Sequence, residues 1–156
     1  MCSPTLCGTW TVQARILRTV DANINRVSEG LRVLEDVARF VLEDENSTRL
    51  LKSVRHQVNN LARSLGIHLL LSRDSEGDIG AAGDLIKEHS DLNSIVRANA
   101  KRAQEGLRVL EELTKLPELK NAIPANEIRK SRYLIYTIEV SLISRLSSHE
   151  TEQTAD

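Results

Sequence analysis

Apolar side chains recur every three or four residues along most of this chain, which is the spacing of one face of an α-helix. The clearest run is expected to be helical from about Val12 to Asp44. Its apolar stripe consists of Val20, Ile24, Val27, Leu31, Leu34, Ala38 and Val41. No stretch of useful length alternates apolar and polar residues, so no strand is expected. The pattern therefore predicts an all-α fold that opens with one long helix.

A second helix is expected after this stripe and before a glycine. Asn46 or Ser47 can cap its N-terminus, and Gly66 can end it after about Leu65. The residues at 67–71 form a short apolar run, and the segment that follows is rich in glycine and acidic residues, which is typical of a loop. The first half of the chain is thus predicted to be a helical hairpin.

The second half predicts another hairpin of the same kind. Ser90 can cap a third long helix that runs to about Leu116, and two prolines separate it from a last helix over about 125–146. The sequence predicts one helical domain with a leader expected to be flexible and a tail expected to be disordered. The expected ranges are 1–12 for the leader, 13–147 for the domain, about 13–71 and 88–147 for its halves, 72–87 for the loop between them, and 148–156 for the tail.

The same seven residues, EGLRVLE, occur at 29–35 and again at 105–111. When 21–40 is aligned with 97–116, 10 of 20 positions are identical. The partner helices match more weakly, with Arg55 in KSVRHQV corresponding to Arg132 in RKSRYLI. The repeat predicts a duplicated helical hairpin whose halves are related by a pseudo-twofold axis.

A second stripe lies about a quarter-turn from the apolar one and is also repeated. Its polar and glycine positions are Asn23, Arg26 and Gly30 in the first copy and Asn99, Arg102 and Gly106 in the second. A glycine inside a helix costs about 1 kcal/mol relative to alanine, so keeping it twice needs a reason. One reason is close approach of another helix, with surface pairs from the arginines to Glu29 and Glu105. The other is room for a ligand beside Asn and Arg.

The loop between the halves contains the sequence RDSEGDIG. Asp74, Glu76 and Asp78 stand at alternate positions beside glycines, and such carboxylates can converge on a hard cation such as Mg²⁺. Arg73 can pair with a phosphate, and His56 lies beside Arg55 on the second helix. The alternative interpretation of the loop is a solvated turn.

Composition and charge exclude several classes of protein. The net charge of −1 argues against a non-specific nucleic-acid binder, which would carry a basic excess. No apolar run is long enough to span a bilayer, and the start of the chain lacks the pattern of a secretion signal. The chain is therefore expected to be cytoplasmic, without a nucleic-acid or membrane partner. Most of its basic residues are arginines, which suit forked recognition of phosphate or carboxylate.

The chain resembles a known family in several blocks that follow one another in order. These are DANINRVSEGLRVLEDVARFVLED, RHQV, SRDSEGDIG, VRANAKRAQEGLRVLEEL and KSRYLIYTIE. They resemble the alternative hydroxymethylpyrimidine-phosphate kinase family of thiamin biosynthesis over about 14–143. The same domain is fused ahead of thiamine-phosphate synthase in some bacteria. The resemblance implies an ATP-dependent kinase that converts hydroxymethylpyrimidine phosphate to the pyrophosphate.

The roles of individual residues follow from the chemistry of such a transfer rather than from the resemblance. The acceptor phosphate is mostly dianionic at pH 7, so cations and positioning matter more than a base. The expected catalytic residues are Arg26, Arg102, Glu29 and Glu105. The expected substrate-binding residues are Asn23, Asn99, Gly30, Gly106, Arg55, His56, Arg73 and Arg132. Mg²⁺ is the expected cofactor, with ATP as co-substrate and Asp74, Glu76 and Asp78 as ligands.

Two other functions fit the same residues. One is an arginine-lined all-α enzyme of another small anionic metabolite, similar in design to chorismate mutase, which leaves the acidic loop unexplained. The other is a non-enzymatic helical scaffold for a thiamin enzyme, in which the Asn–Arg–Gly stripe contacts protein. A glycine-lined helix face fits a homo-oligomer as well as pairing within one chain, and both stay open.

Overall fold

The computed structural model describes the backbone of residues 4–73, 89 and 91–153, with side chains described for 13–73, 89 and 91–148. Its helices are α1 (Pro4–Asp36), α2 (Glu45–Leu65), α3 (Ile67–Leu71), α4 (Leu92–Leu113) and α5 (Ala125–Gln153), with a π-helical turn over Val37–Val41 after α1. The described residues contain no strand, so the predicted all-α fold is confirmed.

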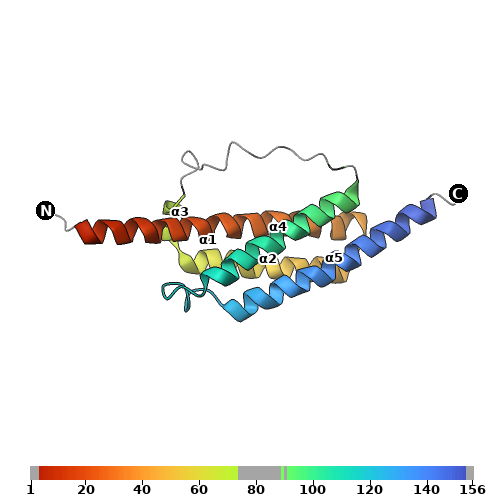
Figure 1. Ribbon diagram of the computed structural model, residues 1–156. Helices are drawn as coiled ribbons and strands as arrows, with labels where there is room; N and C mark the ends of the chain where they lie inside the picture. The colour runs from red at the N-terminus through yellow and green to blue at the C-terminus, as the bar shows by residue number, and fades with distance from the viewer. Residues whose placement is uncertain (1–3, 74–88, 90, 154–156) are drawn as a thin grey trace.

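Two antiparallel hairpins, α1–α2 and α4–α5, lie side by side (Figure 1). α1 packs mainly against α4 and α2, and α4 packs against α1 and α5. The start of α1 and the end of α5 lie at opposite ends of the bundle (Figure 1). α1 and α4 are thus the central pair of the fold, flanked by α2 and α5.

The predicted apolar stripe of the first helix is buried from Val20 to Ala38. It departs from the prediction at Val41, which is half exposed, while Leu42 is buried in its place. The π-helical turn explains this change, because it adds a residue to one turn and so shifts the face that follows it. The Leu42 backbone N–H donates to the carbonyl oxygen of Val37, five residues back.

The helix ends differ from the predicted ones in several places. Asp44, rather than Asn46 or Ser47, caps α2, with its carboxylate accepting from the Ser47 backbone N–H at 3.1 Å. Gly66 ends α2 as predicted, at a φ of 70° that favours glycine.

The second hairpin shows similar differences. The cap of α4 is Asp91, whose carboxylate accepts from the Ser94 backbone N–H at 2.6 Å, whereas Ser90 was the expected cap. α4 ends at Leu113 instead of Leu116. Short polar side chains are interchangeable as caps in a sequence pattern, so the pattern locates a helix start only to within a few residues.

The long helices also extend past the expected domain limits. α1 begins at Pro4, before the expected start near Val12, and α5 begins at Ala125 as expected but continues to Gln153. The expected flexibility of the leader and disorder of the tail stay predictions.

Candidate functional site

The two repeated glycines lie where α1 and α4 cross. A Cβ atom added to Gly30 would lie 2.8 Å from the backbone oxygen of Asn99. One added to Gly106 would lie 2.6 Å from Cγ2 of Val27 and 3.2 Å from the backbone oxygen of Asn23. Close helix approach, one of the two predicted reasons for the glycines, is therefore what they provide. The contacts are reciprocal, as a twofold relation would produce, whereas duplication itself stays a prediction.

The asparagines of the repeated stripe use their amide nitrogens within their own helices. Nδ2 of Asn23 donates to the Thr19 carbonyl oxygen at 2.8 Å, and Nδ2 of Asn99 donates to that of Ile95 at 2.9 Å. Asn23 is also buried. Substrate binding by either asparagine, or by the glycines beside them, stays a prediction.

The expected ion pairs between the repeated arginines and glutamates are not formed. Arg26, Glu29, Arg102 and Glu105 are all exposed, and no Arg26–Glu29 or Arg102–Glu105 pair occurs among the described side chains. Glu105 instead lies 3.8 Å from the ammonium of Lys101. The spacing of three residues permits such a pair but does not hold two flexible side chains together in water.

Two other arginines are bound to buried glutamates at equivalent places in the two hairpins. Nε of Arg55 donates to Oε2 of Glu35 at 2.7 Å, and an Nη of Arg132 donates to Oε2 of Glu111 at 3.1 Å. Glu111 also accepts from Nε of Arg129 at 2.8 Å. These pairs tie α1 to α2 and α4 to α5.

Opposing effects set the pKa of each buried glutamate. Burial raises the pKa of Glu35, but the hydrogen bond and charge of Arg55 outweigh it and lower the pKa below its ordinary value. Burial also raises the pKa of Glu111, and Arg129 and Arg132 together lower it overall. Both glutamates are therefore ionised at neutral pH. His56 is exposed on the next position of α2 after Arg55.

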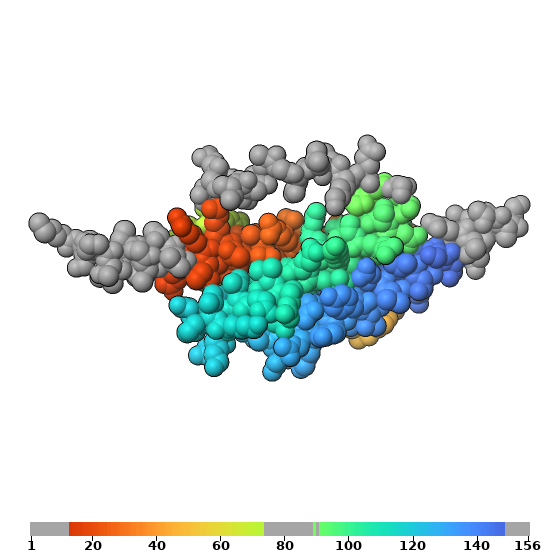
Figure 2. Space-filling view, in the orientation of Figure 1, coloured from red at the N-terminus to blue at the C-terminus, as the bar shows by residue number. Residues whose placement is uncertain are grey.

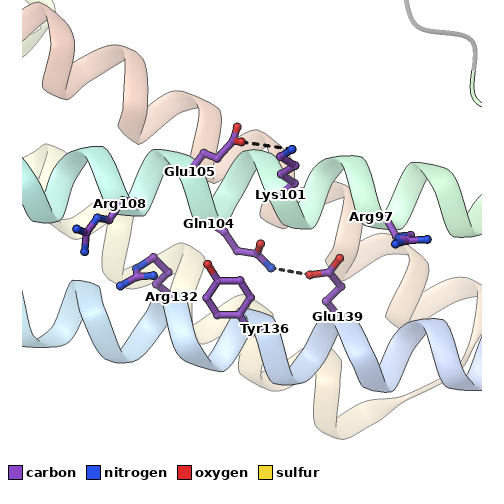
Figure 3. A pocket seen from close by; sticks show the side chains of 8 residues that line it. All are labelled: Arg97, Lys101, Gln104, Glu105, Arg108, Arg132, Tyr136 and Glu139. Atoms are coloured by element: carbon purple, nitrogen blue, oxygen red, sulfur yellow. Dashed lines mark hydrogen bonds and ion pairs between the residues drawn. The ribbon is translucent and has the colours of Figure 1, made fainter.

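A groove of about 480 Å³ runs between α4 and α5 (Figures 2 and 3). In Figure 2 the two helices lie side by side across the visible face. α4 contributes Arg97, Lys101, Gln104, Glu105 and Arg108 to the lining, and α5 contributes Arg132, Tyr136 and Glu139. Four of these side chains are cationic in a chain whose net charge is −1.

Arg132 lies at one end of this groove, near Arg108, and Lys101 and Arg97 lie toward the other end (Figure 3). Burial lowers its pKa, but hydrogen bonding to the Tyr136 hydroxyl and the charge of Glu111 raise it overall. Its Nε is buried and has no hydrogen-bond partner among the described residues. Arg108 is half exposed and lies 3.5 Å from Glu111 and 2.7 Å from Glu112. Both arginines at this end are thus paired with carboxylates, and Nε of Arg132 is the donor left without a described partner.

The corresponding face of the first hairpin has different side chains at several positions. Asp21 stands in place of Arg97, Asn25 in place of Lys101, and Ser28 in place of Gln104. Asp21 is buried and accepts both Nε and an Nη of Arg73, at 2.6 and 2.9 Å. The guanidinium of Arg73 is thus already paired with a carboxylate. The cationic groove belongs to the second hairpin.

The predicted magnesium ligands Asp74, Glu76 and Asp78 lie outside the described residues. Within the described residues, no three His, Cys, Asp or Glu side chains are grouped so that they could hold a metal ion. The metal site therefore stays a prediction.

The predicted site residues include Arg132 and Glu105 but not the other six residues of the groove. These fall outside the repeated Asn–Arg–Gly stripe and are Arg97, Lys101, Gln104, Arg108, Tyr136 and Glu139. The one available signal was the contrast between aligned positions, since a cation or large polar group replaces a small or acidic residue at several of them. That contrast indicates a site only once α4 and α5 are known to be neighbours.

The fold and the groove define an all-α domain that presents a cluster of cations between two helices of its second hairpin. The ThiD2 family model matches residues 18–141, and the chain belongs to the ThiD2 family. No solved structure matches the chain. Among the described residues, no helix has both the length and the apolar character needed to cross a bilayer.

Curated relatives carry the name thiamine-phosphate synthase. The one from Rhodopirellula baltica is 40% identical over 124 residues, which cover 78% of this chain and 33% of the relative. The one from Nostoc punctiforme is 34% identical over 146 residues, covering 91% of this chain and 38% of the relative. The chain thus spans about a third of the length of the curated relatives it matches.

Proposed function

We propose that this protein is a small-molecule kinase of thiamin biosynthesis that uses ATP and Mg²⁺ to convert hydroxymethylpyrimidine phosphate to the pyrophosphate. Membership of the ThiD2 family and similarity to thiamine-phosphate synthases support a place in thiamin biosynthesis. The observation that carries the kinase proposal is the cationic groove between α4 and α5.

The reaction joins two polyanions, so its main barrier is electrostatic. An oxygen of the acceptor phosphate attacks the γ-phosphorus of ATP, and the bond from that phosphorus to the oxygen bridging to the β-phosphate breaks, leaving its electron pair on ADP. The second pKa of a phosphate monoester is near 6, so the attacking oxygen needs no strong base at pH 7. Mg²⁺ supplies neutralising charge on the ATP oxygens.

Arg108 and Arg132 are proposed to hold the acceptor phosphate. Their side chains line the same end of the groove. The buried Nε–H of Arg132 is a donor that no described residue accepts. Arginine binds phosphate through paired hydrogen bonds, which fixes the orientation of the attacking oxygen. Glu111 holds the Arg132 side chain in place through its own hydrogen bond.

Arg26 and Arg102 are proposed to neutralise the ATP phosphates. Both lie in the segments of α1 and α4 that cross, and both are exposed. Arg102 directly follows Lys101, which lines the groove toward the end away from Arg108 and Arg132 (Figure 3).

Phosphorus NMR tests the proposed reaction directly. The protein is mixed with ATP, Mg²⁺ and hydroxymethylpyrimidine phosphate, with the unphosphorylated alcohol as the control acceptor. We expect new pyrophosphate signals and ADP when hydroxymethylpyrimidine phosphate is the acceptor, and neither when the alcohol is the acceptor. Absence of product with folded protein and verified substrate would overturn the kinase proposal and favour the scaffold function.

The repeat provides a matched pair of variants for the acceptor site. Arg32 and Arg108 occupy equivalent positions, are similarly exposed, and each lies near two acidic residues of its own helix. We expect Arg108→Ala to lower kcat/KM about tenfold or more, because a hydrogen bond to a charged group contributes about 1.5–3 kcal/mol. Arg32→Ala should leave it within about twofold of the wild type, since Arg32 lies outside the groove. Equal effects in steady-state kinetics would contradict the assignment of this groove.

A further inference from the structure

A polar pair lies in the middle of the groove between its cationic ends (Figure 3). Nε2 of Gln104 donates to Oε2 of Glu139 at 2.7 Å, and Gln104 is only 8% exposed. A carboxylate only accepts hydrogen bonds, so the amide nitrogen of Gln104 must face it and the amide oxygen must point elsewhere. The pair therefore offers the Gln104 amide oxygen and the second oxygen of Glu139 as acceptors to anything in the groove.

Neither of these oxygens is used by the described part of the molecule. No hydrogen bond or ion pair among the described residues engages Oε1 of Gln104 or Oε1 of Glu139. Glu139 is half-buried beside cations of the groove and yet forms no ion pair with a described residue. A carboxylate there also opposes phosphate binding at the middle of the groove, which leaves its cationic ends, and the Arg108 and Arg132 end is the one proposed for the acceptor phosphate.

Tyr136 lies between the arginine end of the groove and the Gln104–Glu139 pair (Figure 3). Its hydroxyl is directed toward Arg132 in Figure 3, and the residue is 41% exposed. The face of a tyrosine ring provides a platform on which a flat ring can stack. A ligand that is anionic at one end and carries a flat ring with hydrogen-bond donors at the other matches this arrangement.

The hairpin fold does not need these three side chains. At the equivalent positions of the first hairpin, Ser28, Asn59 and Ala62 replace Gln104, Tyr136 and Glu139. The first hairpin keeps the buried glutamate–arginine pair that the two hairpins share, and there Ser28 simply donates to Asn59 at 2.7 Å. The polar pair and its tyrosine therefore occur in the second hairpin and not at the equivalent positions of the first, and they lie where the groove lies.

We infer that Gln104 and Glu139 determine specificity by accepting hydrogen bonds from an amino group on the ring of the substrate. The inference rests on the proposed function, because it concerns the acceptor of that same groove. A ring amine offers N–H donors to the two open oxygens. A carbonyl oxygen at the same ring position would face two acceptors and gain no partner, so the site disfavours it.

Calorimetric binding of two ligands tests this inference. The ligands are hydroxymethylpyrimidine phosphate and the analogue in which a carbonyl oxygen replaces the ring amine. We expect wild-type protein to bind the amine at least about tenfold more tightly, the ratio that one lost charge-assisted hydrogen bond produces. In Glu139→Gln the new amide can turn its N–H₂ toward a carbonyl oxygen, so the ratio should fall toward one or reverse. Glu127→Gln, on the exposed face of α5 outside the groove, is the control and should keep the wild-type ratio.

The outcomes separate the inference from the function on which it rests. If wild-type protein binds neither ligand, the acceptor site itself is wrong. If both ligands bind equally, or if Glu139→Gln keeps the wild-type preference, the specificity inference is overturned while the kinase proposal stands. If Glu139→Gln does not fold, Gln104→Ser decides, because serine is the residue that the equivalent helix carries at this position. A preference unchanged in Gln104→Ser would overturn the inference.

Discussion

Glu35 and Glu111 are ionised side chains of which only 5% is exposed, and each holds an arginine from the neighbouring helix. A buried charge is tolerated only when it is paired, and breaking such a pair by removing one partner destabilises proteins by about 3–5 kcal/mol. The additional arginines near each glutamate, Arg32 and Arg129, reduce that cost here. These glutamates therefore make the stability of the bundle depend on pH.

Acid should destabilise the protein through these two carboxylates. The folded pKa of both lies below the ordinary value of 4.5, so their contribution is fully present above about pH 4.5 and is lost as the pH falls through the folded pKa. The free energy of unfolding in urea should thus decrease below pH 4.5. Glu111→Gln should be less stable at pH 7 and show a shallower decrease below pH 4.5. The same steepness in this variant as in the wild type would show that Glu111 is not responsible.

Arg26 and Arg102 provide a separate test at the residue scale. Neither makes an ion pair with another described residue, and both are exposed, so their substitution should not unfold the protein. Arg26→Ala and Arg102→Ala are each expected to abolish turnover measured by ADP release, because the ATP phosphates lose a cation. Circular dichroism serves as the folding control. Near-normal kinetics in both variants would remove these arginines from the catalytic set.

At the scale of the helices, the crossing of α1 and α4 depends on two glycines, Gly30 and Gly106, which have no side chain to keep the helices apart. Gly30→Ala gains about 1 kcal/mol of helix propensity but places a Cβ 2.8 Å from the backbone oxygen of Asn99, which cannot move without α4. Overpacking of this kind costs about 1–3 kcal/mol. We expect a net loss in the free energy of unfolding, measured by urea denaturation. Ser53→Ala, exposed on α2, is the control and should change little; a stabilised Gly30→Ala would contradict the close approach.

The existence and order of the four long helices could be predicted from the sequence, but the short helix α3 and several helix ends could not. The stripe from Val20 to Ala38 is long and regular enough to identify a buried helix. The π-helical turn at Val37–Val41 leaves no mark in the pattern, because Val41 and Leu42 are both apolar and either can face the core. The correct cap, Asp44, was one of several short polar residues in a row.

At the scale of the whole molecule, the two hairpins share a framework and differ in their outward chemistry. Glu35 with Arg55 and Glu111 with Arg132 are equivalent pairs, and the sequence repeat was sufficient to align their arginines. The groove was not predicted, because its lining comes from residues about 30 positions apart whose proximity depends on how α4 packs against α5. The repeat identifies residues that the two halves share, whereas most of the residues that line the groove differ between the halves.

The reciprocal glycine contacts have a consequence for how mutations combine. The Cβ positions of Gly30 and Gly106 both depend on a single quantity, the separation between α1 and α4. Once an alanine at one position has pushed the helices apart, an alanine at the other meets less obstruction. The double variant should therefore be more stable than the sum of the single losses predicts, with a coupling energy of about 0.5 kcal/mol or more in a double-mutant cycle. Strict additivity would mean that the helices separate locally at one glycine without changing their separation at the other.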